Sequence, residues 1–372
     1  MNTANTADLF STYALGPITL TNRIVLAPLT RSRAIGNVPN DLMMTYYAQR
    51  ADAGLLITEG TAPSPNGLGY PRIPGMYSSE QVAGWKKVTD AVHAKGGKIF
   101  VQLMATGRVS HPSNMPKGAE VVAPSAVQLS GEMFTDSAGL QPYPTPRAMV
   151  QHDIDQAIHE YVHASTMAIK AGFDGVELHG ANGYLIDQFL NTASNLRTDG
   201  YGGTPENRNR FALEVAKAVV SAIGAERTGI RLSPFGGFSD MASWDGLEAQ
   251  FVELAAGLGK MKLVYIHIVD HSSMGMPAVP LSVKEGIRDA FGGTIIVSGG
   301  LDKAKAEAAL EQGLGQLAAF GRSFLANPDL VERLRANAPL NEADQKTFYT
   351  PGAAGYTDYP VLEKAVACSR SH

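Results

Sequence analysis

Cysteine is almost absent from this chain of 372 residues, and the single one, Cys368, stands close to the C-terminus. One cysteine cannot form an internal disulfide, hold an iron–sulfur cluster or build a thiolate zinc site. The chain also lacks any stretch near the roughly 20 apolar residues of a membrane-spanning helix. Its first residues, MNTANTADLFSTYALG, lack the apolar run of a signal peptide. We therefore expect a protein of the reducing cytoplasm, with no metal centre and no membrane partner.

An excess of charge of one sign is missing as well. The 31 Lys and Arg residues nearly balance the 35 Asp and Glu residues, which gives a formal net charge of -4 and a pI near 6.1. Such a balance offers no electrostatic attraction to nucleic acid or to an anionic membrane surface. Small molecules are thus the expected partners, bound by a monomer or a small homo-oligomer.

Short apolar runs alternate with helical patterns along the whole chain, and apolar residues make up 44% of it. The runs show no polar–apolar alternation, as expected of parallel strands that are covered by helices. The eight runs are RIVLAPL (23–29), GLLITEG (54–60), KIFVQLM (98–104), DGVELHG (174–180), GIRLSPF (229–235), LVYIHIV (263–269), TIIVSGG (294–300) and QLAAFGR (316–322). Between them lie helical patterns such as 205–224 and 304–313. Eight strand–helix pairs predict an α/β fold of the TIM (β/α)8 barrel type. A doubly wound sheet ranks second, because no G-x-G-x-x-G follows the first run.

Two segments depart from a minimal barrel. Residues 11–23, STYALGPITLTNR, predict a small N-terminal hairpin that caps the bottom of the barrel. Residues 106–150 separate the third strand from its helix and are rich in Pro, Gly, Ser and Met. A connection of this length is usually functional, so we expect a lid or binding loop. Residues 1–372 are otherwise expected to form one domain.

The ends of the strands are where the chemistry of this fold is expected, because the C-terminal ends of the strands and the loops after them build the active site. Ser298, Gly299 and Gly300 leave the seventh strand, and Gly321 and Arg322 leave the eighth. Free backbone N–H groups after these two strands form the usual phosphate site of a TIM barrel. The alternative is that the glycines only make tight turns and that Arg322 is a solvated surface residue. The pattern favours a phosphorylated ligand, which is either a substrate or a cofactor with a phosphate tail.

Two polar residues, Gln102 and Arg231, stand within the third and fifth apolar runs. A buried arginine needs a partner, because an unpaired buried charge costs several kcal/mol. A planar ring with carbonyl and nitrogen acceptors would satisfy both side chains. A salt bridge from Arg231 to Glu59 or Glu177 on another strand would also satisfy the charge. The spacing of the residues leaves these two possibilities open.

Several long segments carry a resemblance to a known family. They are LTNRIVLAPLTRSRA, HGANGYLIDQFLN, SNLRTDGYGGTPENRNRFALEV, IIVSGG, FGRSFLANPDL and FYTPGAAGYTDYP. Across nearly its whole length the chain resembles the Old Yellow Enzyme family of FMN-dependent ene-reductases. Within that family it is most similar to the bacterial branch that includes N-ethylmaleimide reductase and pentaerythritol tetranitrate reductase.

The resemblance implies that FMN lies across the top of the barrel. The cofactor-binding residues that it implies are Pro28, Leu29, Thr30, Gly60, Gln102, Arg231, Ser298, Gly299, Gly300, Gly321 and Arg322. Among these, Thr30 would bond flavin O4, Gln102 would contact the pyrimidine part of the ring, and Arg231 would lie near N1. The last two loops would hold the phosphate.

The same resemblance assigns the catalytic roles. His179 and Asn182 would donate hydrogen bonds to the carbonyl or nitro oxygen of an activated alkene, and Tyr184 would protonate carbon after hydride transfer from flavin N5. Met104 and Tyr349 would border the substrate pocket. The chain departs from the usual Leu-Trp-His after Gln102, with LMA at 103–105, which predicts a roomier and softer pocket. Position 60, often Ala in relatives, is Gly here.

The predicted function is therefore an FMN-dependent NAD(P)H oxidoreductase that reduces activated C=C bonds in α,β-unsaturated carbonyls, nitroalkenes and maleimides. A quinone, nitro or nitroester reductase on the same scaffold is the near alternative. A cofactor-free aldolase or isomerase would need a lysine or a carboxylate pair at the strand ends, and no lysine ends a candidate strand. A flavin-binding protein without turnover would have no use for Tyr184 or for the pair formed by His179 and Asn182.

Overall fold

A closed barrel of eight parallel strands forms the centre of the computed structural model, which describes residues 8–362. Cys368 lies outside the described residues. The barrel strands are β3 (Ile24–Leu26), β4 (Leu55–Ile57), β5 (Ile99–Leu103), β10 (Gly175–Gly180), β11 (Thr228–Leu232), β12 (Tyr265–Val269), β13 (Thr294–Ser298) and β14 (Leu317–Phe320). Each pairs in parallel with the next, and β14 pairs with β3 to close the ring. The predicted TIM barrel is confirmed; seven strands lie inside their predicted runs, and β11 begins one residue before its run, at Thr228.

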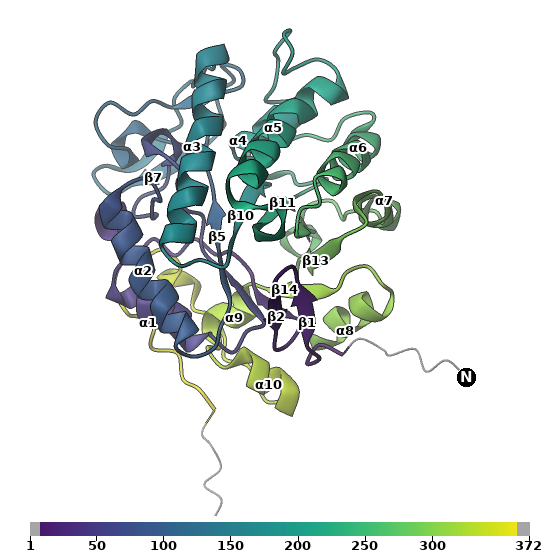
Figure 1. The fold of residues 1–372 in the computed structure, drawn as a ribbon. Helices are drawn as coiled ribbons and strands as arrows, with labels where there is room; N and C mark the ends of the chain where they lie inside the picture. The colour runs from purple at the N-terminus through teal and green to yellow at the C-terminus, as the bar shows by residue number, and fades with distance from the viewer. Residues whose placement is uncertain (1–7, 363–372) are drawn as a thin grey trace, which may run out of the picture.

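The helices stand around the strands (Figure 1). They are α1 (Asp41–Gln49), α2 (Ser79–His93), α3 (Gln151–Lys170), α4 (Leu185–Leu190), α5 (Pro205–Ile223), α6 (Leu247–Lys260), α7 (Leu281–Phe291), α8 (Lys303–Glu311), α9 (Arg322–Ala326) and α10 (Leu330–Ala336). Short 3-10 turns are η1 (Ile35–Asn37), η2 (Pro65–Gly67), η3 (Pro112–Asn114), η4 (Ala225–Arg227), η5 (Phe238–Asp240), η6 (Ser272–Met274) and η7 (Gln345–Thr347).

Local sequence explains where these helices begin. In α5, the Thr204 side chain accepts from the Asn207 N–H at the first turn, and Pro205 takes the first helical position, where its missing N–H does no harm. In α2, Ser78 and Gln81 satisfy each other's backbone N–H groups in a capping box. These signals place each helix start directly after a loop at the barrel rim.

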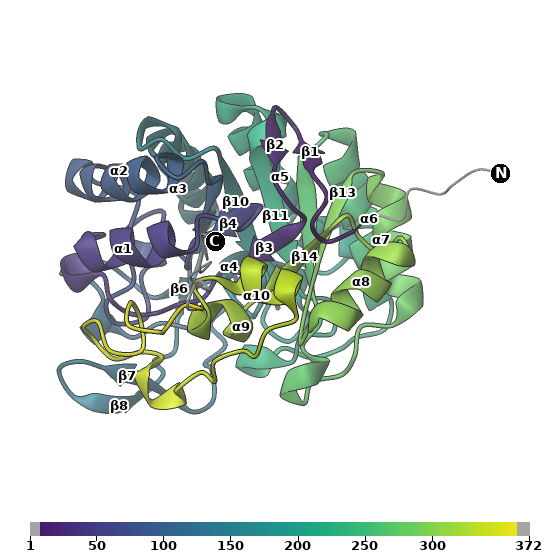
Figure 2. The ribbon, with the colours of Figure 1, turned by 90° about the horizontal axis from the view of Figure 1, so that it is seen from below.

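The N-terminal hairpin consists of β1 (Tyr13–Leu15) and β2 (Ile18–Leu20). Its Leu15 and Leu20 are buried against barrel side chains that include Leu55, Phe100 and Tyr265. Seen from below, the hairpin lies against one end of the barrel (Figure 2). The predicted cap is confirmed, and the opposite end of the barrel is left for the site.

The long connection after the third barrel strand runs from β5 to the start of α3 at Gln151, as predicted. It contains β6 (Val122–Ala123), β7 (Glu132–Thr135), β8 (Gly139–Pro142) and β9 (Arg147–Ala148). Strands β7 and β8 form an antiparallel hairpin, and β6 pairs with β9. Met133 of β7 packs in a small cluster with Tyr70 and Tyr184. The insertion therefore reaches the mouth of the barrel.

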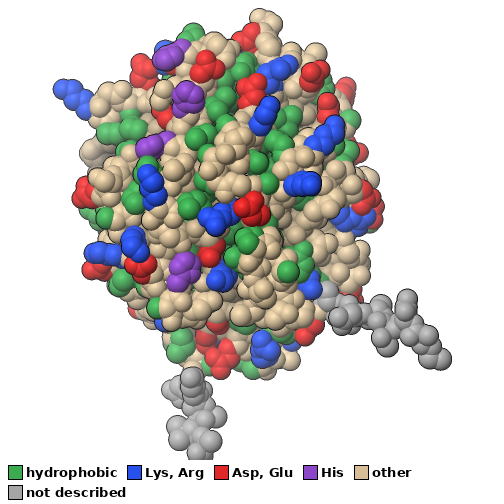
Figure 3. Space-filling model, in the orientation of Figure 1, with side chains coloured by type: hydrophobic (Ala, Val, Ile, Leu, Met, Phe, Trp, Pro, Cys, Tyr) green, Lys and Arg blue, Asp and Glu red, His purple; other side chains and the backbone are tan. Residues whose placement is uncertain are grey.

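The surface carries charges of both signs. On the face drawn in Figure 3, Lys and Arg side chains are interspersed with Asp and Glu side chains. Across residues 8–362, none of the helices combines the length and the apolar character that crossing a membrane requires.

Candidate active site

The barrel places the predicted polar residues side by side through strand register. His179 on β10 is the register partner of Arg231 on β11, and Arg231 is the partner of His267 on β12. Glu177, two residues before His179, is the partner of Gln102 on β5. Residues two apart on a strand face the same side of the sheet, so this polar set lines one interior region of the barrel near its mouth.

A chain of buried hydrogen bonds crosses the barrel beneath this mouth. Gln102 Nε2 donates to Glu177 Oε1 at 2.8 Å. The second carboxylate oxygen of Glu177 lies 2.9 Å from His267 Nδ1, and His267 Nε2 lies 3.0 Å from Ser298 Oγ. Burial lowers the pKa of His267, so its ring is neutral. Because the amide nitrogen of Gln102 is committed to Glu177, its amide oxygen remains to accept a hydrogen bond.

Arg231 forms no salt bridge among the described residues, so the ion-pair alternative for this side chain is not realised. Glu177 is engaged as above, and Glu59 accepts instead from the Tyr47 hydroxyl at 3.3 Å. Arg231 Nε is buried without a hydrogen-bond partner, and burial lowers the pKa of the guanidinium. A buried donor on a charged group is expensive to leave unpaired. The side chain is therefore suited to a ligand that brings acceptors.

His179 and Tyr184 lie together at the end of β10, with ring centroids 5.0 Å apart. His179 Nδ1 is buried and has no partner in the described chain. Burial, with a contribution from nearby Arg231, holds the pKa of His179 well below 6.5, so the imidazole is neutral. Burial also raises the pKa of Tyr184 to about 12, and its hydroxyl is 3.1 Å from that of Tyr70.

Asn182 has a left-handed backbone, with φ +61, a conformation that asparagine adopts more readily than most residues. Its backbone N–H donates to Ser233 Oγ at 2.9 Å. Its side-chain Oδ1 lies 2.7 Å from His271 Nε2. The next residue, Gly183, donates its N–H to the buried Asp187 carboxylate at 2.8 Å. The loop between His179 and Tyr184 is thus fixed from both sides.

The loop after β13 can be built only with glycine at two positions. Gly299 has φ +125, and a Cβ there would lie 1.9 Å from the Asp270 carbonyl oxygen. Gly300 has φ +60, and a Cβ there would lie 2.4 Å from Ser273 Cβ. The side chain of Ser298 points to His267, so Ser298 offers a ligand its backbone rather than its hydroxyl.

After β14, Gly321 precedes α9, whose first residue is Arg322. The Arg322 side chain is exposed. The structure thus brings the two predicted phosphate loops to the ends of neighbouring strands, since β13 pairs with β14.

Gly60 and Met104 prove to be a coupled pair. A Cβ at position 60 would lie 2.4 Å from Met104 Sδ, so the thioether occupies the space that an alanine side chain would need. Met104 is 1% exposed and packs in a cluster that includes Tyr70 and Tyr184. The methionine therefore acts on the pocket chiefly through the two tyrosine rings beside it. The two departures from the family pattern are one change in packing.

The C-terminal segment is held against the loop after β3, which carries Pro28, Leu29 and Thr30. Arg31 Nε and Arg33 Nη1 both donate to the Phe348 carbonyl, at 3.1 and 2.8 Å. Both arginines are buried; Arg31 follows Thr30 directly in the sequence, and Arg33 stands two residues further on. The next residue of the segment, Tyr349, has a side chain that is 62% exposed, as a residue at the rim of a pocket would have.

Arg72 joins three segments at the same rim. Its Nε donates to the Ser32 carbonyl at 3.0 Å, and its Nη2 donates to the Tyr349 carbonyl at 2.9 Å. Its Nη1 pairs with Asp136 in the turn of the β7–β8 hairpin. The C-terminal segment, drawn in yellow, accordingly runs beside that hairpin in Figure 2.

Sequence reasoning missed Tyr70, His271 and the role of Glu177 as an anchor for Gln102. His271 stands two residues after the end of β12, the sixth barrel strand, so the strand-end rule could have found it. Tyr70 belongs to a loop after β4 that no strand-end position identifies. Its contact with Tyr184 depends on how that loop folds back over the mouth.

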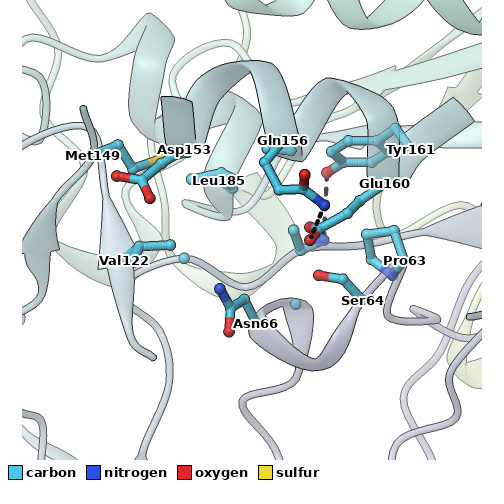
Figure 4. Close-up of a pocket in the computed structure, with 14 residues that line it drawn as sticks. Pro63, Ser64, Asn66, Val122, Met149, Asp153, Gln156, Glu160, Tyr161 and Leu185 are labelled. Atoms are coloured by element: carbon cyan, nitrogen blue, oxygen red, sulfur yellow. Dashed lines mark hydrogen bonds between the residues drawn. The ribbon is translucent and has the colours of Figure 1, made fainter. Parts of the chain in front are cut away.

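A separate small cavity lies between α3 and the loops that follow β4 and β5 (Figure 4). Gln156 Nε2 donates to Glu160 there, and the Tyr161 hydroxyl accepts from the Ala105 N–H. The residues lining it include none of the predicted site residues. The cavity is therefore distinct from the mouth of the barrel.

Comparison with known proteins decides the family. The model of the NADH:flavin oxidoreductase / NADH oxidase family matches residues 8–341. The chain is 43% identical over 374 aligned residues to 12-oxophytodienoate reductase 7 of Oryza sativa subsp. japonica, covering 96% of this chain and 95% of the relative. The chain belongs to the Old Yellow Enzyme family.

Two further Old Yellow Enzyme relatives agree. A probable flavin mononucleotide-dependent alkene reductase of Leishmania infantum is 44% identical, with 92% of this chain and 94% of the relative covered. The structure of morphinone reductase in complex with tetrahydroNAD superposes with a TM-score of 0.91 at 45% identity, covering 96% of this chain and 98% of the other. This Old Yellow Enzyme is therefore an FMN-dependent enzyme that uses NAD(P)H to reduce activated C=C bonds, as the sequence predicted.

Proposed function

We propose that FMN binds across the C-terminal mouth of the barrel, in one domain that spans residues 1–372. The observation that supports this most is the pair of buried nitrogens without partners, Arg231 Nε and His179 Nδ1, at neighbouring register positions. A neutral apolar ligand would leave both unsatisfied. A ring edged with oxygen and nitrogen atoms would satisfy them.

Each part of the cofactor has residues suited to it. The free amide oxygen of Gln102 could accept from an imide N–H, and Arg231 would stabilise negative charge on the reduced ring. Pro28, Leu29 and Thr30 in the loop after β3 would line the ring, with Gly60 in the loop after β4. Backbone N–H groups of Ser298, Gly299, Gly300 and Gly321 and the exposed guanidinium of Arg322 would hold the phosphate.

The substrate oxygen is held by His179 and Asn182. Neutral His179 has one ring N–H to donate, and the Asn182 amide nitrogen makes no hydrogen bond among the described residues. Negative charge grows on a carbonyl or nitro oxygen as hydride reaches the conjugated carbon, and a preorganised donor there contributes about 3 kcal/mol to lowering the barrier. Bound FMN supplies that hydride from its N5.

Tyr184 is the proton donor to the carbon next to the activating group. Its pKa of about 12 keeps the phenol protonated at neutral pH. The Tyr70 hydroxyl, 3.1 Å away, fixes the direction of the Tyr184 hydroxyl. Met104 packs against these two rings, and Tyr349 borders the opening, so both would shape the space for the alkene.

The substrates are α,β-unsaturated carbonyls, nitroalkenes and maleimides, with NADPH or NADH as the reductant. The insertion 106–150 acts as a lid, because its β7 strand already packs against Tyr70 and Tyr184. Assignment to the bacterial branch stays a prediction. The scarcity of cysteine supports work in a reducing cytoplasm. A monomer or a small homo-oligomer stays a prediction.

Titration of the oxidised, FMN-loaded enzyme with a phenol tests the oxygen-binding pair, because a phenolate oxygen is an acceptor like that of the substrate. His179→Ala and Asn182→Ala should each weaken phenol binding about ten-fold or more, since each removes one positioned donor. His163→Ala, on the exposed face of α3, is the matched control. Unchanged phenol affinity in both site variants would refute the assignment.

A further inference from the structure

The side-chain amide of Asn182 is oriented by a residue from a different loop. His271 follows β12, and its Nε2 lies 2.7 Å from Asn182 Oδ1. The imidazole is 9% exposed, and the Phe238 ring packs against it edge to face, with centroids 4.7 Å apart. His271 is therefore held in place by packing as well as by this hydrogen bond.

The backbone of Asn182 is fixed independently of His271. Its N–H donates to Ser233 Oγ at 2.9 Å, and its carbonyl accepts from Ser239 Oγ at 3.4 Å. Ser233 and Ser239 both belong to the connection after β11. Consequently the remaining freedom at Asn182 is in its side chain, above all in the rotation that exchanges the amide oxygen and nitrogen.

That rotation decides whether Asn182 helps or hinders the reaction. A planar amide has an acceptor oxygen on one side and a donor nitrogen on the other. A substrate oxygen that gains negative charge is stabilised only by the nitrogen side, and it would be repelled by the amide oxygen. Burial lowers the pKa of His271 to about 4, so the neutral ring carries one N–H, and donation from Nε2 engages the oxygen of Asn182.

We propose that His271 is a positioning residue, which holds the Asn182 amide so that its nitrogen faces the substrate oxygen. The inference rests on the role proposed above for Asn182. It adds a residue of this chain that sets which end of the Asn182 amide, the oxygen or the nitrogen, faces the substrate. The register of the barrel brings the three loops together, because β10, β11 and β12 are consecutive neighbours.

A double-mutant cycle on the FMN-loaded enzyme tests this positioning role. The probe is 4-hydroxybenzaldehyde, titrated into oxidised enzyme and followed by the change in flavin absorbance. His271→Ala should weaken binding about ten-fold, the factor expected for one lost hydrogen bond. In the Asn182→Ala background the same substitution should change binding by less than about two-fold, because the group it orients is gone.

Two further variants separate positioning from a general structural effect. His271→Gln should restore most of the affinity, because the Gln side-chain amide can donate to Asn182 Oδ1. His163→Ala should leave affinity unchanged. FMN content and the melting temperature, measured for every variant, show whether each protein is folded and loaded with FMN. If His271→Ala does not fold or does not bind FMN, His271→Gln still tests the positioning role.

The outcomes distinguish a failure of the positioning role of His271 from a failure of the proposed role of Asn182. Equal weakening by His271→Ala in both backgrounds, or unchanged binding beside a large loss in Asn182→Ala, would overturn the positioning role alone. Unchanged binding in Asn182→Ala itself would overturn the proposed role of Asn182, and the positioning role with it.

Discussion

At the scale of single residues, the proposed role of Tyr184 separates the two halves of the catalytic cycle. As the proposed proton donor, its hydroxyl would be needed when the alkene is protonated but not when nicotinamide reduces the flavin. Tyr184→Phe should therefore slow alkene reduction about 100-fold or more, the usual contribution of a general acid, while flavin reduction by NAD(P)H stays largely intact. Stopped-flow measurement of both half-reactions checks this. Tyr201→Phe, whose hydroxyl bonds Glu214 on the barrel exterior, is the matched control. Equal losses in both half-reactions would count against the proton-donor role.

The pH dependence of alkene reduction follows from the same residues. The pKa of His179 lies well below 6.5, so its ring is already neutral at pH 6.5. The pKa of Tyr184 is raised to about 12, so its phenol is protonated at any lower pH. Neither group changes charge between about pH 6 and pH 9. The rate at which reduced enzyme reacts with an enone should be flat across this range. A single ionisation near pH 7 that abolishes the rate would contradict the assigned protonation states.

The sequence predicted several residues of the candidate site but not the residues that contact them. The motif HGANGY, with the family resemblance, predicted roles for His179, Asn182 and Tyr184, and the structure places them at the end of β10 and in the loop that follows it. The sequence did not predict which residues contact them, because Tyr70 lies 114 residues from Tyr184 and His271 lies 89 residues from Asn182. The strand-end rule points to the position of His271 but not to its contact with Asn182. The sequence also did not predict that the Met104 side chain fills the space beside Gly60, because this depends on the direction in which one flexible thioether points.

At the scale of structural elements, the loop after β13 needs glycine at position 299 for two reasons: the backbone has a positive φ, and the Asp270 carbonyl leaves no room for a Cβ. Gly299→Ala would place a Cβ 1.9 Å from the Asp270 carbonyl oxygen in a backbone with φ +125, so the loop must shift. We expect FMN affinity to fall at least ten-fold, because the backbone N–H groups that would hold the phosphate move with the loop. Fluorescence titration of apoenzyme with FMN measures this change.

Gly313→Ala is the control for that loop. Gly313 also has a positive φ of +67, but nothing lies within 4 Å of its Cβ position. It should therefore lose some stability from backbone strain without losing FMN affinity. A Gly299→Ala enzyme that binds FMN as tightly as Gly313→Ala would exclude this loop from the phosphate site.

The positions of the strands and helices were largely predictable from the sequence, but the contacts between segments far apart in the sequence were not. Short, mostly apolar runs without polar–apolar alternation placed all eight barrel strands, since strands that are buried on both faces need such composition. The same patterns could not show that Arg31 and Arg33 hold the C-terminal segment, or that Arg72 ties the β7–β8 hairpin to that segment. Apart from the ion pair of Arg72 with Asp136, those contacts join arginines to backbone carbonyls at least 277 residues away in the sequence. A backbone carbonyl is present at every residue, so composition cannot show which one an arginine will bind.

At the scale of the whole molecule, the fold explains why the site can be assembled from so many loops. The hairpin β1–β2 closes one end of the barrel with Leu15 and Leu20, and Glu177 ties Gln102 and His267 together inside it. The opposite end can then present Arg231 and His179 with unpaired nitrogens. In the proposed function, the barrel supplies the stability, and the loops at its open end would supply the acceptor and donor groups for the ring and the alkene.

The central claim is that this open end binds FMN where an alkene oxygen can be held beside it. Anaerobic reduction of the purified enzyme with NADPH or NADH, followed by addition of N-ethylmaleimide or 2-cyclohexenone, tests it most directly. We predict that the flavin absorbance bleaches and then returns, with one saturated product formed per flavin re-oxidised. Protein that takes up no FMN when it is supplied, or reduced flavin that neither alkene re-oxidises, would contradict the account.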